Sequence, residues 1–228
     1  TLPVLLALRR LSRMVPFSDE HLRRLGQLAF HEAAHALAQH CSGRVVACVH
    51  ISLKGGAAEA PTRIFSGETP LEGIYICAAG ILSDAQLSVE TNDDGPESDA
   101  EKIRQAIKSL GLDAKGIKSL WNFILAFQER LQQCKAYMGT ISRLAEALLD
   151  VDALINYELK LIVRDEFLEI VGDVADDPEV KETFLNLKGL CLGDPIDPVL
   201  PPFGFLGGLR QDEIEDGKSL AGGVVGRG

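Results

Sequence analysis

Long apolar runs are absent from this chain. The apolar run at residues 2–8 falls far short of the ~20 residues that cross a membrane as a helix. No small-residue cleavage site follows it, so it does not look like a secretory signal. We therefore expect no membrane span in this chain.

Paired cysteines are missing as well. The five cysteines are odd in number, widely spread and without any C-x-x-C pair, which argues against a disulfide framework and against a zinc site built from thiolates. This usage is typical of a reducing compartment, and we expect a cytoplasmic location. The cysteines are Cys41, Cys48, Cys77, Cys134 and Cys191.

The chain also lacks a dense cluster of positive charge. The chain has 23 Lys and Arg against 33 Asp and Glu, a net charge of −10 at pH 7. Because binding to phosphates needs a basic surface, we expect no nucleic-acid partner. The one concentration of arginines, at positions 9, 10, 13, 23 and 24, is interpreted as a solvated face. The hydrophobic content of the chain is sufficient for a folded protein. With 46% hydrophobic residues over a length of 228, we expect a sizeable buried core.

One pattern indicates metal chemistry, the sequence His31-Glu32-Ala33-Ala34-His35. Four residues advance a helix by about 400°, so both imidazoles project from one side and can share an ion. Glu32 then lies beside the metal, where it can accept a proton from a zinc-activated water and return it to a leaving group. The pattern predicts a hydrolytic zinc site, against the alternative of a helix that carries two histidines by chance.

The flanking residues favour the helix that this pattern needs. Ser18 is placed as an N-cap, and Asp19 and Glu20 suit the positive end of the helix dipole. Residues 42–43, Ser-Gly, provide a stop. We expect a buried helix between these signals.

A third zinc ligand has to come from elsewhere, since a catalytic zinc takes three protein ligands and one water. The remaining histidines fit poorly: His21 lies about 15 Å along the helix axis, His40 points away from the metal, and His50 lies on an expected strand. The metzincin pattern fails because Ala38 and Cys41 replace its glycine and third histidine. The ligand should then be a later carboxylate. The candidates are Asp84, Asp93, Asp94, Glu97 and Asp99.

The rest of the motif-bearing part alternates short strands and helices. Residues 44–53 predict a strand followed by a turn at 54–56, and a second short strand is expected near 62–66. A helix should run from 71 to about 87. After a polar loop at 90–97, a capping box at Ser98 to Glu101 predicts a helix that runs to about residue 110.

The second half is expected to be helical almost throughout, from residue 114 to about 173, and one of its amphipathic stretches is 154–163. The fold class predicted is mainly α with a small β-sheet or hairpin. We divide the chain into a helical metallopeptidase-like domain, residues 1–190, and a Gly/Pro-rich tail, residues 191–228. The domain has a motif-bearing part, 18–111, and a helical bundle, 112–190.

Several segments, in order, resemble the protease domain of the FtsH family of ATP-dependent zinc proteases. His31 to Leu37 is similar to its H-E-A-G-H motif, Val49 to Leu53 running into Gly55 to its V-T-I strand, Ala78 to Asp84 to its A-G-R-A-A-E helix, and Ser98-Asp99 to its N-D-L-x-x-A-T helix start. The resemblance covers about residues 25 to 111. Only the first motif is highly specific.

The resemblance implies roles for individual residues. His31, His35 and Asp99 match the zinc ligands and Glu32 the catalytic glutamate, while Asp84 matches a glutamate next to the site and is the alternative third ligand. The chain departs from the family pattern at Ala34, Ile81 and Ala100, which leaves the ligands intact and alters their surroundings.

The family's ATPase module is not matched. The stretch Gly111 to Ser119 misses a phosphate-binding loop by one inserted residue. We therefore expect a stand-alone zinc metalloendopeptidase of flexible or unfolded polypeptides, or one that works with an ATPase or adaptor in trans. The alternatives are a catalytically silent zinc-binding regulator and a zinc hydrolase of small amides.

Overall fold

A computed structural model describes residues 2–14, 18–52, 55–59, 70–86, 99–150, 152–154 and 159–191. Its helices are α1 (Leu2–Met14), α2 (Asp19–Cys41), α3 (Pro70–Gln86), α4 (Asp99–Ser109), α5 (Ala114–Gln133), α6 (Lys135–Leu148), α8 (Arg164–Val171) and α9 (Pro178–Cys191), with a 3-10 turn, η1 (Val174–Asp176). Its strands are β1 (Cys48–Ser52), β2 (Gly55–Glu59) and β3 (Leu159–Val163). The prediction of a mainly helical fold with a small sheet is confirmed.

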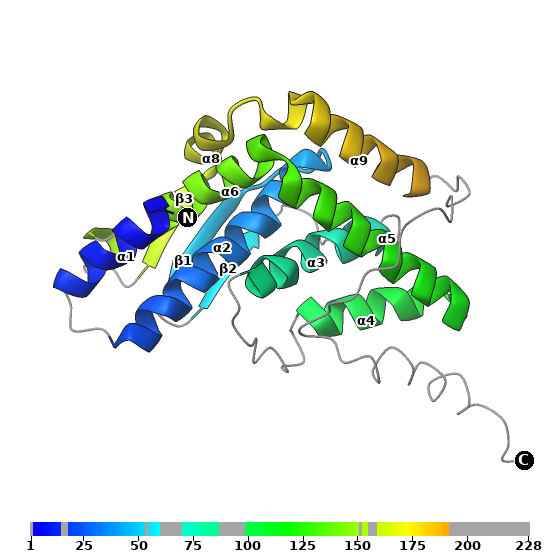
Figure 1. The fold of residues 1–228 in the computed structure, drawn as a ribbon, viewed down its shortest axis with the longest axis horizontal. Coiled ribbons are helices and arrows are strands. Elements are labelled where there is room, and N and C mark those ends of the chain that lie inside the picture. The colour runs from blue at the N-terminus through cyan, green and yellow to red at the C-terminus, as the bar shows by residue number, and fades with distance from the viewer. Residues whose placement is uncertain are drawn as a thin grey trace, which may run out of the picture.

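Helix α2 lies at the centre of this arrangement, in contact with α3, α6, β1 and β2 (Figure 1). The Ser18 hydroxyl accepts a hydrogen bond from the backbone N–H of His21, as expected of an N-cap. Alanines make up much of its buried surface: Ala29, Ala33 and Ala36 are fully buried. Because an alanine adds only a methyl group, neighbouring elements can approach the backbone of α2 closely.

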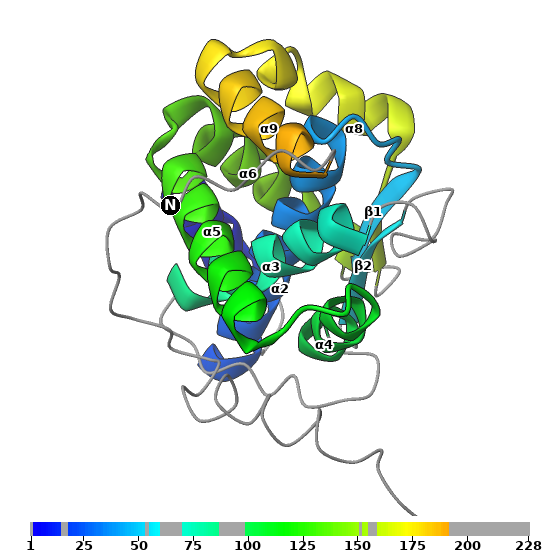
Figure 2. The same ribbon diagram turned by 90° about the vertical axis from the view of Figure 1, so that its right-hand side faces the viewer.

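Helix α3 runs beside α2 and is fixed to the end of it by an ion pair. The side chain of Arg44, just past the C-terminus of α2, donates from Nε to Glu72 Oε2 at 2.9 Å. The buried faces of both helices join one hydrophobic core, with Leu37 on α2 and Ile74 on α3 fully buried. Helix α4 packs against α3, and α9 lies on the opposite side of the molecule (Figure 2).

The sheet is antiparallel with the order β2-β1-β3. In its register, His50 on β1 lies opposite Ala57 on β2 and Leu161 on β3. Val49 and Ile162, which pair with each other, are fully buried, whereas Leu161 is exposed. One face of the sheet therefore belongs to the core, and its other face carries His50 and Leu161.

Two expectations about strands were wrong. Residues 55–59 form β2, although a turn was expected at 54–56, and residues 159–163 form β3, although 154–163 was expected to be part of a helix. The alternating apolar residues of this segment pair with β1, and long-range pairing outweighs local helix preference there. The second strand expected near 62–66 and the expected tail beyond residue 191 lie outside the described residues.

Within the described residues, no helix combines the length and the apolar character needed to cross a membrane.

Candidate metal centre

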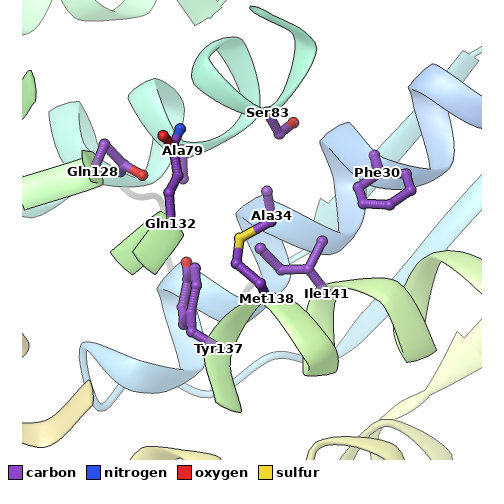
Figure 3. A pocket seen from close by; sticks show the side chains of 9 residues that line it. All are labelled: Phe30, Ala34, Ala79, Ser83, Gln128, Gln132, Tyr137, Met138 and Ile141. Atoms are coloured by element: carbon purple, nitrogen blue, oxygen red, sulfur yellow. The ribbon is translucent and has the colours of Figure 1, made fainter. Parts of the chain in front are cut away.

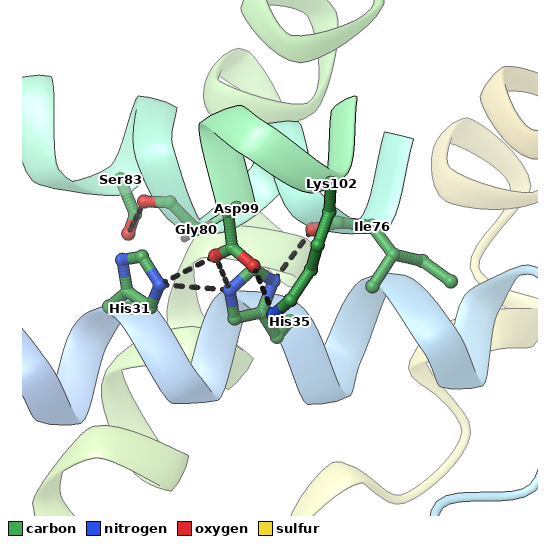
Figure 4. Close-up of polar contacts among 7 residues, drawn as sticks. All are labelled: His31, His35, Ile76, Gly80, Ser83, Asp99 and Lys102. Carbon is green, nitrogen blue, oxygen red and sulfur yellow. Dashed lines mark hydrogen bonds and ion pairs between the residues drawn. The ribbon is translucent and has the colours of Figure 1, made fainter. Parts of the chain in front are cut away.

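Three polar side chains from two helices converge at one point (Figure 4). His31 and His35 project from the same side of α2, and their Nε2 atoms lie 2.9 Å apart. Asp99, the first residue of α4, places Oδ2 at 3.0 Å from His31 Nε2 and at 2.6 Å from His35 Nε2. The structure thus brings together the two histidines of the motif and the aspartate that the resemblance points to.

The three ligand atoms are of types that bind a metal ion, and the distances between them are close to those around a bound zinc. Two imidazole nitrogens and one carboxylate oxygen are ligands typical of catalytic zinc. Around a tetrahedral zinc with bonds of about 2.0–2.1 Å, neighbouring ligand atoms are ~3.3 Å apart. The observed separations of 2.6–3.0 Å would need to widen by about 0.3–0.7 Å.

The orientation of His35 is set by the backbone of α3. Its Nδ1 lies 2.7 Å from the carbonyl oxygen of Ile76, which can only accept a hydrogen bond, so Nδ1 carries the proton. In neutral His35 the lone pair is then on Nε2, directed at Asp99 Oδ2 and His31 Nε2. A metal ion bound at this point would face that lone pair, and a hydrogen-bonded Nδ1–H is the usual outer support of a zinc-binding histidine.

Asp99 is held in its ionised form. Only 7% of the residue is exposed, and burial by itself would raise its pKa. The charge of His35, hydrogen bonds from both histidines and the ammonium of Lys102 outweigh burial, so the pKa of Asp99 lies well below its ordinary value. Lys102, one turn along α4, donates from Nζ to the second carboxylate oxygen, Oδ1, at 2.9 Å.

A glycine on α3 makes room for the two imidazoles. A Cβ atom added to Gly80 would lie 2.4 Å from His35 Nε2 and 2.8 Å from His31 Nε2. Both distances are far below van der Waals contact, so any side chain at position 80 would occupy the space where the two nitrogens meet. Ser83 closes the same turn of α3 by donating its hydroxyl to the Gly80 carbonyl at 2.7 Å.

Glu32 is buried next to this cluster, with 6% of the residue exposed. Burial raises its pKa above the ordinary value; the charges of His35, His31 and His50 partly oppose this increase, and that of Asp99 adds to it. Strand β2 passes beside it, because a Cβ atom added to Gly56 would lie 2.8 Å from Glu32 Cγ. A carboxylate with a raised pKa beside a metal centre is suited to take up and release a proton near neutral pH.

The other histidines lie away from the convergence point. His21 forms a 2.8 Å contact from Nδ1 to the Ser18 hydroxyl, and the ring of His40 stacks edge-on against Phe167 with centroids 5.6 Å apart. His50 is close enough to influence the pKa of Glu32 but is not in the ligand group.

Among the acidic candidates, Asp93, Asp94 and Glu97 lie outside the described residues. Asp84 belongs to α3, but its side chain lies outside what the structure describes, so its place next to the site stays a prediction.

A second group of possible ligands, Cys134, Asp177 and Glu179, has a simpler explanation. The Asp177 carboxylate accepts hydrogen bonds from the backbone N–H groups of Glu179 and Val180, as an N-cap of α9 does. The Cys134 thiol lies 4.0 Å from the same carboxylate oxygen. We assign this group to helix capping.

Sequence reasoning missed three contributors to the centre: the Ile76 carbonyl, the space at Gly80 and the ammonium of Lys102. A backbone carbonyl has no sequence pattern of its own. Lys102 could have been found, because its spacing of three residues from Asp99 on a predicted helix allows the two side chains to meet.

Comparisons of this chain with protein-family models, with curated proteins and with solved structures find no match. The similarity to the FtsH protease domain therefore stays a prediction that rests on the quoted sequence segments.

Proposed function

We propose that this chain is a zinc-dependent metallopeptidase of the FtsH protease-domain type, with His31, His35 and Asp99 as metal ligands and Glu32 as the general base and acid. The observation that supports it most directly is the hydrogen bond from His35 Nδ1 to the Ile76 carbonyl. It turns the remaining lone pair of His35 toward the same point as His31 Nε2 and Asp99 Oδ2.

In this proposal the chain's own residues divide the work. A zinc ion bound there would polarise the scissile carbonyl and lower the pKa of a water. The Ile76 carbonyl keeps His35 in the tautomer whose Nε2 can bind the metal. The ammonium of Lys102 donates a hydrogen bond to Asp99 Oδ1, so that Oδ2 is the carboxylate oxygen that can bind the metal. Glu32 accepts the proton of the attacking water at its carboxylate and delivers it to the leaving amine.

Flexible or unfolded polypeptides are the substrates we propose for these 228 residues, which contain no phosphate-binding loop of the kind that powers unfolding. An ATPase or adaptor acting in trans would widen this range. The alternatives require the same ligands. A silent zinc-binding regulator would not use Glu32, whereas a hydrolase of small amides would use it in the same way on a different substrate.

Exchange of Glu32 for Gln, with casein as the substrate, separates the peptidase from the silent regulator. With casein as the unfolded substrate, we expect the zinc-loaded Glu32→Gln variant to keep its metal and its fold and to lose at least about a hundredfold in cleavage rate, the effect of removing a general base. Glu182→Gln serves as the control, because Glu182 is an exposed carboxylate on α9, paired with Arg130. Equal cleavage by Glu32→Gln and wild type would reject the mechanism. No cleavage of casein by either protein, with a full complement of zinc, would favour the regulator.

A further inference from the structure

A small pocket lies between α2, α3, α5 and α6 (Figure 3). All nine residues of its lining are uncharged, and it has room for about one water molecule, too little for an organic ligand. Charge that lacks a partner lies on the surface instead, on helix α1 at the edge of the molecule (Figure 1).

Helix α1 is fixed to the core by one of its faces. Leu11 is fully buried, and Ala7 is only 9% exposed. Leu8 lies against α2, since a Cβ atom added to Gly26 would meet Leu8 Cδ1 at 2.8 Å. The helix is therefore part of the folded domain, and its opposite face is the one that can meet a partner.

This opposite face combines leucines with arginines. Leu5 is 55% exposed and Leu6 is 50% exposed, and the three arginines of α1 are exposed as well. At about 100° per residue, these five residues span roughly 140° of the helix, on the side away from Ala7 and Leu11. We call this strip the outer face of α1; it consists of Leu5, Leu6, Arg9, Arg10 and Arg13.

The outer face is basic in a chain that is otherwise acidic. Helix α1 has three arginines and no acidic residue, whereas the net charge of the chain is −10. No carboxylate of the described residues pairs with any of these arginines. Other arginines of the protein each pair with a glutamate, namely Arg44, Arg104 and Arg130. The arginines of α1 are exposed, as the sequence predicts, and are available to an anionic partner.

The two arginines at the start of α2 contribute less. Arg23 and Arg24 are exposed, but Asp19 and Glu20 lie one helical turn before them and offset their charge. The basic surface that can attract a partner is therefore the outer face of α1.

The partner has to receive arginine and leucine side chains along the same strip. Nucleic acid offers phosphates but no apolar layer beneath them. An acidic protein would need both carboxylates and an apolar pocket in matching positions. An anionic bilayer offers both without such a match, because charged headgroups lie directly above the acyl chains.

We propose that the outer face of α1 docks this protein on the surface of an anionic lipid bilayer. Leu5 and Leu6 enter the layer just below the headgroups, and the guanidinium groups stay at the level of the lipid phosphates. Helix α1 remains packed on the core, so the contact is with the membrane surface and is not a span. The docking does not require the metal centre and goes beyond the proposed peptidase function.

Sedimentation of the full chain with lipid vesicles tests this proposal. We expect the protein to bind vesicles of phosphatidylserine mixed with phosphatidylcholine, and not to bind vesicles of phosphatidylcholine alone. Because exposed charges supply much of the attraction, about 0.5 M salt should release the bound protein.

Exchange of the three arginines of the outer face for Gln measures their contribution. The triple variant should bind the mixed vesicles on the order of a hundredfold more weakly, about fivefold for each charge. The matched control removes the same number of positive charges from exposed lysines elsewhere, and it should bind as wild type does. These lysines are Lys108, Lys115 and Lys118.

The leucines distinguish a bilayer from an acidic macromolecule. Leu5→Gln with Leu6→Gln should weaken binding to the mixed vesicles by about tenfold or more, since two apolar side chains no longer enter the lipid. Leu185→Gln is the control, because Leu185 on α9 is 56% exposed and lies outside the outer face. It should leave binding unchanged.

The proposal fails if wild-type protein does not bind the mixed vesicles at low salt, or if the arginine variant binds them as tightly as wild type. Unchanged binding of the Leu5/Leu6 variant would also overturn it, because charge alone would then suffice and an acidic macromolecule would be the better partner. Asp99→Asn, which removes a proposed metal ligand, should bind the vesicles as wild type does, so failure of the peptidase proposal would leave this result unaffected.

Discussion

Gly80 and His35 lie so close together that a side chain at position 80 would force the imidazole or the helix to shift. A Cβ atom there would approach His35 Cε1 to 2.5 Å, in addition to its clash with Nε2. The glycine is therefore part of the proposed metal centre, although it offers no ligand atom. Its contribution is the empty volume in which two imidazoles meet.

Gly80→Ala should consequently disrupt zinc binding more than it disrupts the fold. The added methyl group must push His35 and His31 apart or displace α3, at a cost of about 1–3 kcal/mol, as for overpacking. Urea unfolding and zinc content of the purified protein are the measurements. Gly139→Ala is the control within α6, where the nearest atom to the new methyl group is Arg143 Nη1 at 3.9 Å. It should stabilise the protein by about 0.5–1 kcal/mol. Full zinc content in Gly80→Ala would show that the centre is not built as described.

Wild-type protein should bind zinc at one ion per chain, and Asp99→Asn should lose it. The amide keeps the shape of the side chain but removes the negative charge that faces His31 and His35. We expect the zinc affinity to fall by more than the roughly 10- to 100-fold that loss of an outer support costs. Metal analysis and competition with a chelator would measure this.

Asp84→Asn is the matched comparison for that experiment. Asp84 is the alternative third ligand that the sequence left open, and its exchange should leave zinc affinity nearly unchanged if Asp99 is the ligand. The reverse result, zinc retained by Asp99→Asn and lost by Asp84→Asn, would assign the third position to Asp84.

Lys102 and a metal ion should compete for the same carboxylate charge. In metal-free protein, Lys102→Met removes the ammonium that pairs with Asp99, and we expect a loss of about 1 kcal/mol in the free energy of unfolding, since the lysine side chain is 45% exposed. Without that positive charge, added zinc should stabilise the variant more than it stabilises wild type. Urea unfolding with a chelator and with zinc would show both effects. Lys108→Met, also on α4, should change neither by more than about 0.5 kcal/mol.

Alkaline pH should destabilise the fold through Cys41. Burial, together with the neighbouring Cys134 thiol, raises the pKa of Cys41 from its ordinary value of 9.0 to about 12. Above pH 9 the unfolded chain releases this proton while the folded protein keeps it, so the folded state binds more protons and stability falls as pH rises. The contribution is complete below pH 9 and is lost by about pH 12. Urea unfolding across this range should show a smaller decline in Cys41→Ala, and an equal decline would contradict the assignment.

Local sequence signals predicted the helices that carry the centre. Ser18 caps α2 as expected, and the capping box at 98–101 marks the start of α4 within one residue of the observed Asp99. These predictions succeed because caps depend on hydrogen bonds between residues a few positions apart. The helix at α2 fixed the relative placement of His31 and His35, whereas Asp99 was singled out among five carboxylates only by the resemblance.

The sheet could not be predicted in the same way. Strand β3 is more than a hundred residues from β1 in sequence, and its alternation of apolar residues is too short to distinguish it from a helix. Only the pairing of Ile162 with Val49, both fully buried, decides its structure. The Ile76 carbonyl and the closeness of Gly80 likewise depend on how α3 lies against α2.

Helix α4 has few anchors of its own: its buried residues are Asp99, Ile103 and Ala106. Asp99 is 68 residues away from His31 in sequence, and its contacts with the two imidazoles join α4 directly to α2. The docking of α4 is thus coupled to this cluster, and the amide hydrogens of α4 should exchange more slowly once zinc is added.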